Sequence, residues 1–174
     1  MRENLELVLN NIEKACKKVN RDVRDVKLIA VSKTKPIDMI REVNSLGVLD
    51  FGENRVQELD EKRELLNTVK WHLIGHLQTN KVRKLLSGDV ELIHSVDSIK
   101  LAREINKEAL KLNKKINILI EVNVSQEDSK TGILESDLYE LVECVMGLDN
   151  INLCGLMTVA PHVSNPEDVR KYFN

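Results

Sequence analysis

The sequence predicts an α/β fold on a parallel sheet, of the (β/α)8 TIM-barrel type. Short apolar segments alternate along the 174 residues with longer segments that have helical spacing. The apolar segments, such as Ile116–Val124, are apolar on both faces, which is typical of strands covered on both sides. The turn after the first of them, at 32–36, has no glycine, whereas doubly wound nucleotide-binding sheets usually have a glycine-rich turn there. A doubly wound open sheet is the alternative.

The predicted elements follow in order. The first is an amphipathic helix, because Leu5, Val8, Leu9, Ile12 and Val19 keep a spacing of three and four. Six strands are then expected at Lys27–Ser32, Leu49–Gly52, Trp71–Gly75, Val90–His94, Ile116–Val124 and Ile151–Thr158. Helices are expected between them at Pro36–Leu46, Asn54–Leu66, Gln78–Leu86, Asp97–Leu112 and Glu135–Leu148, with a last one near Pro166. Six β/α units make an incomplete barrel, and we expect one domain over residues 1–174.

Three helix boundaries have a chemical cause. Pro36 suits the first turn of a helix, where its missing N–H is not needed. Gly47 can take the left-handed conformation that ends the same helix. Asp97 is the expected N-cap of the helix that carries Leu101 and Ile105.

Composition excludes several classes of function. The net charge of −2 and the aromatic content of 3% argue against nucleic-acid binding. The cysteines, Cys16, Cys144 and Cys154, are far apart and form no zinc pattern, which fits reduced thiols in the cytoplasm. No segment is apolar enough to span a membrane, and charges stand where a signal peptide needs an apolar stretch.

Lys33 is the strongest candidate for chemistry. It follows an apolar strand, where we expect its apolar neighbours to remove water from the amine. Desolvation favours the neutral, nucleophilic form of an amine, which forms Schiff bases with aldehydes such as pyridoxal phosphate. In a barrel, the residues that follow the other strands lie at the same rim: Asn54, His76, Asp97, Asn123, Lys130, Met157 and His162. Polar and basic groups there favour an anionic small ligand over a metal ion.

The histidines also allow purely structural interpretations. His72 either points into the barrel or is a hydrogen-bonded histidine of the core. His72 and His76 are four residues apart, like helical zinc ligands, but this segment is a predicted strand and has no third partner. We therefore expect no metal site.

Several motifs together resemble one family. They are Val31-Ser-Lys-Thr-Lys-Pro36, Phe51-Gly-Glu-Asn-Arg-Val-Gln-Glu58, Trp71-His-Leu-Ile-Gly-His-Leu-Gln-Thr-Asn-Lys81, His94-Ser-Val-Asp97, Asn123-Val-Ser125 with Ser129-Lys-Thr-Gly132, and Gly155-Leu-Met-Thr158. From about residue 5 onward the chain is similar to the pyridoxal phosphate homeostasis proteins of the YggS/PROSC type.

The resemblance implies a barrel like the alanine racemase N-terminal domain, which is fold type III among pyridoxal phosphate proteins. It implies that Lys33 holds pyridoxal 5′-phosphate as a Schiff base and that Asn54, His72 and Met157 line the cofactor pocket. Lys130 matches a family lysine near the mouth of the pocket. The implied role is a cofactor carrier or regulator rather than an enzyme, with pyridoxal phosphate-dependent apo-enzymes as possible partners.

Two alternatives remain open. One is a racemase or decarboxylase that uses the cofactor. Racemisation needs a second acid–base group near the cofactor, and the position of both tyrosines, Tyr139 and Tyr172, in predicted outer helices argues against it. The other is a barrel that binds another phosphorylated metabolite through the charge of Lys33. The family's Ser-Met-Gly-Met-Ser and Val-Arg-Ile-Gly-Thr motifs do not occur in the sequence. Because barrel phosphate sites commonly lie after strands seven and eight, we expect weak cofactor binding, and unpaired sheet edges that favour self-association.

Overall fold

The computed structural model describes residues 1–125, 131–161 and 163–173. Its centre is a parallel sheet in which each strand pairs with the next one along the chain. The strands are β1 Ala30–Val31, β2 Asp50–Glu53, β3 Lys70–Leu73, β4 Leu92–Val96, β5 Ile116–Glu121 and β6 Ile151–Met157. This sequential order is that of a (β/α) barrel, and it excludes the doubly wound alternative, whose strand order reverses.

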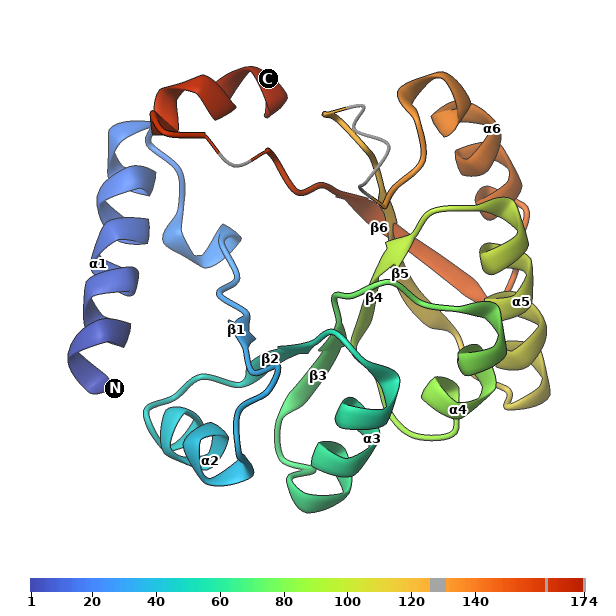
Figure 1. Cartoon of the computed structure of the whole chain (residues 1–174), viewed down its shortest axis with the longest axis horizontal. Helices are drawn as coiled ribbons and strands as arrows, with labels where there is room; N and C mark the ends of the chain where they lie inside the picture. The colour runs from blue at the N-terminus through green and yellow to red at the C-terminus, as the bar shows by residue number, and fades with distance from the viewer. Residues whose placement is uncertain (126–130, 162, 174) are drawn as a thin grey trace.

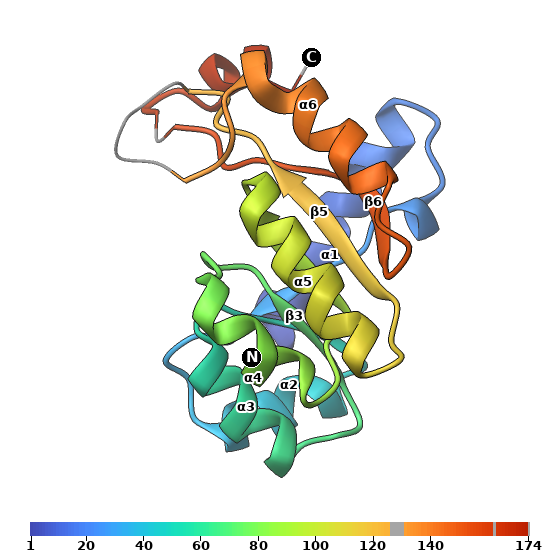
Figure 2. The ribbon, with the colours of Figure 1, turned by 90° about the vertical axis from the view of Figure 1, so that its right-hand side faces the viewer.

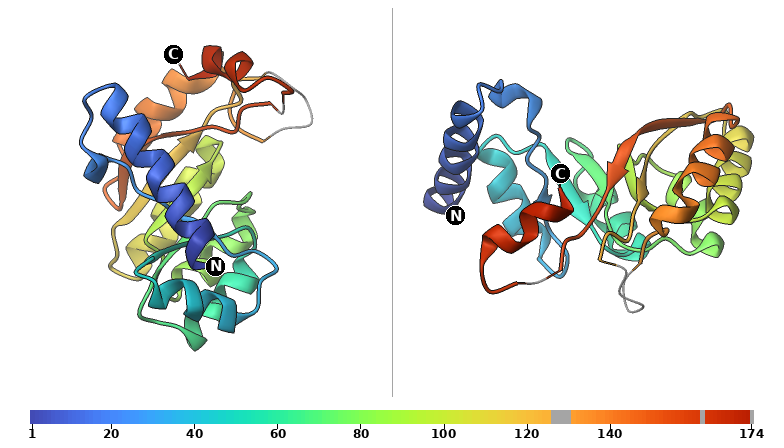
Figure 3. Two further views of the ribbon diagram at one scale, coloured as in Figure 1. Left: turned by 90° about the vertical axis from the view of Figure 1, so that its left-hand side faces the viewer. Right: turned by 90° about the horizontal axis from the view of Figure 1, so that it is seen from above.

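The helices follow the outer side of the curved sheet (Figure 1). They are α1 Arg2–Lys18, α2 Ile37–Ser45, α3 Val56–Leu65, α4 Val82–Leu86, α5 Ile99–Lys111 and α6 Glu135–Met146, with 3-10 helices η1 Val23–Asp25, η2 Thr79–Lys81 and η3 Pro166–Tyr172. Helix α5 lies against β5 and α6 lies beside β6 (Figure 2), whereas α1 stands at the other end of the curved sheet (Figure 3). No helix in the described ranges is both long and apolar enough to cross a membrane.

The hydrophobic core lies between the sheet and this outer layer of helices. The strand register places Phe51 beside Trp71, and Leu73 beside Ile93, on the same outward face. The indole N–H of Trp71 donates to the carbonyl of Leu66 over 3.0 Å and so fixes the end of α3 to β3. The outward face of the strands therefore supplies the core, and the inward face and the strand ends remain for function.

The predicted elements are present, with shifted boundaries. β1 is much shorter than Lys27–Ser32, since in the described chain it pairs with β2 alone. Gln78–Leu86 divides into η2 and α4, and the last predicted helix is the 3-10 helix η3. Gly47 follows the C-cap of α2 with φ of 97°, as expected. The prediction of Asp97 as N-cap is wrong: the Ser98 hydroxyl accepts the Leu101 N–H.

Candidate functional site

The carboxyl ends of the six strands meet at one edge of the sheet, called here the carboxyl rim. Because every strand pair is parallel, the residues that follow each strand lie at this edge. The rim includes Lys33 after β1, Asn54 after β2, His76 after β3, Asp97 after β4, Asn123 after β5, and Met157 at the end of β6. The grouping expected from the sequence is therefore present. Lys130 and His162, also predicted there, lie outside the described residues.

Lys33 occupies a tight turn directly after β1. The N–H of Lys35 donates to the carbonyl of Ser32 over 3.0 Å and closes the turn. The N–H of Ser32 donates to the carbonyl of Gly52 over 3.0 Å, which ties the turn to β2. The side chain of Lys33 is exposed, so the predicted shelter by apolar neighbours is wrong. Ala30 of the strand is partly buried but Val31 is 52% exposed, and the turn carries the lysine beyond both.

Asn54 is half-buried, and a close backbone approach fixes its loop. A Cβ atom built on Gly75 would lie 2.4 Å from the carbonyl oxygen of Asn54 and 2.7 Å from its Cα atom. Only glycine allows the loops after β2 and β3 to come this close. The rim therefore has a rigid segment beside the turn that carries Lys33.

His72 lies on the inward face of the sheet, in a file of three hydrogen-bonded side chains. Its Nε2 atom is 3.0 Å from Asp50 Oδ1, and its Nδ1 atom is 3.0 Å from His94 Nε2. Strand register places Asp50 toward the amino end of the sheet and His94 toward the carboxyl rim. His72 therefore both points into the barrel and is hydrogen-bonded, which joins the two interpretations left open by the sequence.

Burial makes both histidines of this file hard to protonate. It lowers the pKa of His94 to about 4, with the neighbouring His72 adding to the effect. Burial also lowers the pKa of His72, although the hydrogen bond and charge of Asp50 oppose it. Burial pushes the pKa of Asp50 up, but hydrogen bonds from His72 and Lys27 outweigh burial and hold it below its usual value. The file consists of an ionised carboxylate and two neutral imidazoles at neutral pH.

Glu121 is a rim residue that the sequence reasoning missed. It ends β5 with 5% of its surface exposed, and its Oε1 atom accepts the Thr131 hydroxyl over 2.5 Å. Burial raises the pKa of Glu121, and the charge of Asp97 adds to this. His76 Nδ1 lies 3.3 Å from Asp97 Oδ2 in the same region. The available signal was an acidic residue that closes a mostly apolar strand. Within the described ranges no cluster of histidine, cysteine or carboxylate side chains is arranged to hold a metal ion.

Met157 is partly buried and lines a cavity of about 630 Å³ between β5, β6, α6 and η3. Tyr172 of η3 lines the same cavity, so it does not lie on an outer helix as predicted. Tyr139 is 81% exposed on α6, as expected of an outer helix.

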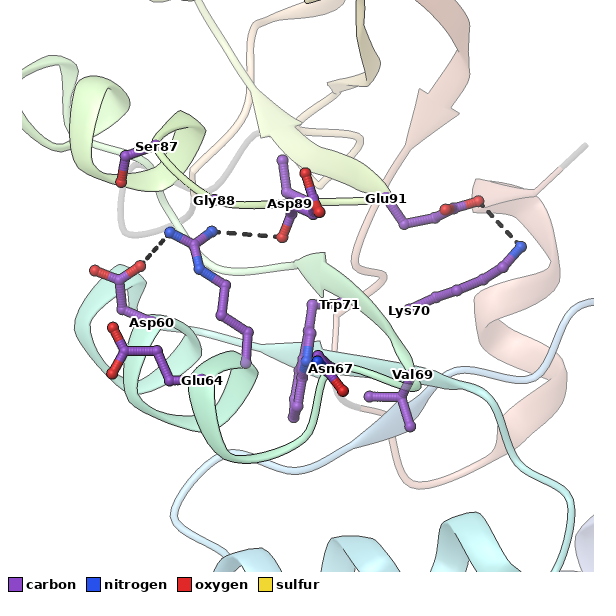
Figure 4. Close-up of a pocket in the computed structure, with 12 residues that line it drawn as sticks. Asp60, Glu64, Asn67, Val69, Lys70, Trp71, Ser87, Gly88, Asp89 and Glu91 are labelled. Atoms are coloured by element: carbon purple, nitrogen blue, oxygen red, sulfur yellow. Dashed lines mark hydrogen bonds and ion pairs between the residues drawn. The ribbon is translucent and has the colours of Figure 1, made fainter.

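A second cavity, of about 510 Å³, lies at the opposite edge of the sheet, beside α3 and the amino ends of β3 and β4 (Figure 4). Two ion pairs line it: Arg63 pairs with Asp60, and Lys70 Nζ lies 3.4 Å from Glu91 Oε1. Glu64 and Asp89 also line the cavity, so its lining carries an excess of negative charge. This cavity is separate from the carboxyl rim and contains none of the predicted site residues.

Comparison with known proteins agrees with this architecture. Residues 4–174 match the alanine racemase N-terminal domain. The chain is 49% identical over 173 residues to the pyridoxal phosphate homeostasis protein of Aquifex aeolicus, covering 98% of this chain and 75% of that protein. It superimposes with a TM-score of 0.75 on PipY of Synechococcus elongatus with PLP bound, at 32% identity, covering 92% of this chain and 79% of PipY. Alanine racemase of Clostridium difficile, at 20% identity and a TM-score of 0.77, shares the fold; the match covers 98% of this chain and 46% of the racemase.

Proposed function

This chain belongs to the family of pyridoxal phosphate homeostasis proteins, and from this premise we propose that it binds pyridoxal 5′-phosphate through Lys33. Its role is that of a carrier or regulator in homeostasis of the cofactor, without turnover of a substrate. Pyridoxal phosphate-dependent apo-enzymes are the proposed recipients of the cofactor. The proposed compartment is the cytoplasm, which is supported by the three free cysteines, because reduced thiols are typical of cytoplasmic proteins.

The observation that supports this proposal best is the placement of Lys33. Its amine is exposed on a closed turn at the carboxyl rim, the edge at which barrel proteins bind their ligands. In the described chain, Lys33 forms no ion pair or side-chain hydrogen bond that would engage the amine. A free primary amine beside a rigid loop fits a ligand that has an aldehyde.

The other residues of the rim have supporting roles in this proposal. Asn54 offers an amide beside the turn, on the loop that Gly75 fixes. Met157 contributes an apolar wall at the far side of the rim. His72 lies deeper and acts through His94, which it orients toward the rim end of the barrel interior. The bound cofactor supplies an aldehyde that condenses with the lysine amine, so a C=N bond forms and one water leaves.

Borohydride reduction followed by peptide mass spectrometry tests the proposal. After incubation with pyridoxal phosphate, we expect one adduct, on Lys33, because reduction traps the C=N bond as a stable amine. Lys33→Ala should lose the adduct and the visible absorbance that accompanies it. Lys35→Ala is the matched control, since Lys35 is an exposed lysine two residues away. An adduct that persists in Lys33→Ala, or that is spread over surface lysines, contradicts the proposal.

A second candidate function is a racemase-like or decarboxylase-like activity. The presence of Tyr172 in the cavity that Met157 lines favours it, since racemisation needs a second acid–base group near the cofactor. Incubation of the loaded protein with single amino-acid enantiomers distinguishes the two functions. A carrier leaves the enantiomers unchanged, whereas an enzyme racemises or decarboxylates them and loses that activity in Tyr172→Phe.

A further inference from the structure

We infer that a largely buried charge network of Glu53, Glu58 and Lys62 positions Lys33 by holding the backbone of the turn that carries it. This inference rests on the proposed function of Lys33. The network lies on β2 and α3, and two of its members, Glu58 and Lys62, are not among the rim residues predicted from the sequence.

The turn has an unusual backbone conformation next to Lys33. Thr34 has φ of 63°, in the left-handed region that glycine and asparagine normally occupy. A β-branched residue adopts this conformation only where surrounding contacts hold it there, and such residues concentrate at functional sites. The turn therefore needs external support, and it carries the lysine proposed to bind the cofactor.

The network supplies this support on both sides of Lys33. The Glu58 Oε1 atom accepts the backbone N–H of Thr34 over 2.6 Å. The Lys62 ammonium donates to the backbone carbonyl of Ser32 over 2.8 Å. The Ser32 hydroxyl also donates to Glu53 Oε1 over 2.7 Å. The backbone groups that flank Lys33 are thus both fixed, while its own side chain extends away from them.

Lys62 is the centre of the network. Its side chain is 9% exposed, and its Nζ atom lies 2.6 Å from Glu53 Oε1 and 2.7 Å from Glu58 Oε1. With the Ser32 carbonyl, these acceptors use all three N–H donors of the ammonium group. Burial pushes the pKa of Glu58 up, but hydrogen bonds from Lys62 and the Thr34 N–H outweigh it, so the carboxyl stays ionised at neutral pH.

A charge network of this kind often stabilises a fold less effectively than apolar packing does. Burying charges costs desolvation energy that ion pairing repays only in part, and apolar side chains of similar volume often stabilise a protein as well or better. Glu53 is fully buried, and its Oε2 atom has no hydrogen-bond partner among the described residues. What apolar residues could not supply is the set of hydrogen bonds to the backbone at Ser32 and Thr34. Positioning of the turn accounts for these contacts.

Variants of Glu58 test the inference. Glu58→Leu removes the acceptor of the Thr34 N–H, whereas Glu58→Gln keeps an oxygen there and removes only the charge. We expect Glu58→Leu to slow formation of the Lys33 Schiff base about tenfold, the equivalent of one charge-assisted hydrogen bond, and Glu58→Gln to stay within about threefold of the wild type. Absorbance after mixing with pyridoxal phosphate gives the rate. Exchange of the Thr34 amide hydrogen, measured by NMR without cofactor, should accelerate in Glu58→Leu alone.

Glu108→Leu is the matched control, because Glu108 is 5% exposed and paired with Lys111 on α5, away from the turn. It should leave both the rate and the Thr34 exchange unchanged. Equal rates and equal exchange in wild type and Glu58→Leu overturn the inference, as does equal slowing in Glu108→Leu. If the wild type forms no adduct on Lys33, the proposed function is wrong. The exchange of the Thr34 amide hydrogen alone then tests whether the network holds the turn. If Glu58→Leu does not fold, Glu58→Ala takes its place.

Discussion

At the scale of single residues, protonation states follow from burial and from one fixed acceptor. Because Asp50 is ionised, the Nε2 atom of His72 carries the hydrogen that is donated to it. The Nδ1 atom of His72 is then an acceptor, so the Nε2 atom of His94 donates to it. The Asp50–His72–His94 file thereby fixes both tautomers and leaves Nδ1 of His94 without a proton. This orientation requires a neutral His72, because a proton on its Nδ1 atom would remove the acceptor of the His94 N–H.

The low pKa of His94 predicts a pH-dependent stability. The unfolded chain protonates this histidine below its usual pKa of about 6.5, whereas the folded protein does so only near pH 4. Between these values the unfolded state binds more protons, so the free energy of unfolding falls as the pH falls. We expect the His94 contribution to fall by about 2 kcal/mol from pH 7.5 to pH 5.

Urea unfolding of wild type and His94→Gln at several pH values measures this contribution. The glutamine amide can still donate to His72 but does not titrate, so the stability of the variant should rise relative to the wild type as the pH falls. Parallel stability curves between pH 7.5 and pH 5 would contradict the prediction.

At the scale of elements, the carboxyl rim depends on loops that approach one another closely. The loop after β2 and the loop after β3 touch through the backbone of Asn54 and Gly75. This contact places the predicted pocket residue Asn54 against a rigid neighbour rather than in a free loop. The motifs around Gly52 and Gly75, which the sequence displays as two separate segments, form one structural unit here.

Gly75→Ala should separate these loops. The added Cβ atom would meet backbone atoms of Asn54 that cannot rotate away, so we expect a loss of about 1–3 kcal/mol in the free energy of unfolding. Adduct formation at Lys33 should also weaken, since Asn54 is displaced. Gly147→Ala is the control, because the nearest atom to its Cβ is 3.5 Å away and its φ of −86° suits alanine. Equal stability of the two variants in chemical denaturation would refute this account.

At the scale of the whole molecule, the sheet has two outer edges. In the part of the chain that the structure describes, β1 pairs only with β2 and β6 only with β5. Leu156 on β6 is 57% exposed, and Val31 on β1 is 52% exposed. Exposed strand edges with apolar side chains favour pairing between copies.

The expectation of weak cofactor binding stays a prediction, which an absorbance titration with pyridoxal phosphate tests.

We expect the protein to self-associate at high concentration through the β6 edge. Leu156→Lys should reduce this association, because a charged side chain on an edge strand opposes pairing with another strand. Sedimentation velocity over a range of concentrations measures it. Leu110→Lys on α5, where the leucine is 64% exposed, is the control for added charge alone. A concentration-independent monomer in the wild type would rule out the prediction.

By itself, the sequence determined the order of strands and helices, the parallel sheet and the gathering of Lys33, Asn54 and Met157 at one rim, because these depend on apolar periodicity and on the direction of the chain. Only the tertiary structure decided that Lys33 is exposed, that His72 bonds to Asp50 and His94, and that Glu53, Glu58 and Lys62 hold the Lys33 turn. These contacts join residues up to 30 positions apart. Local spacing does not reveal them, since they depend on how neighbouring strands and helices are aligned.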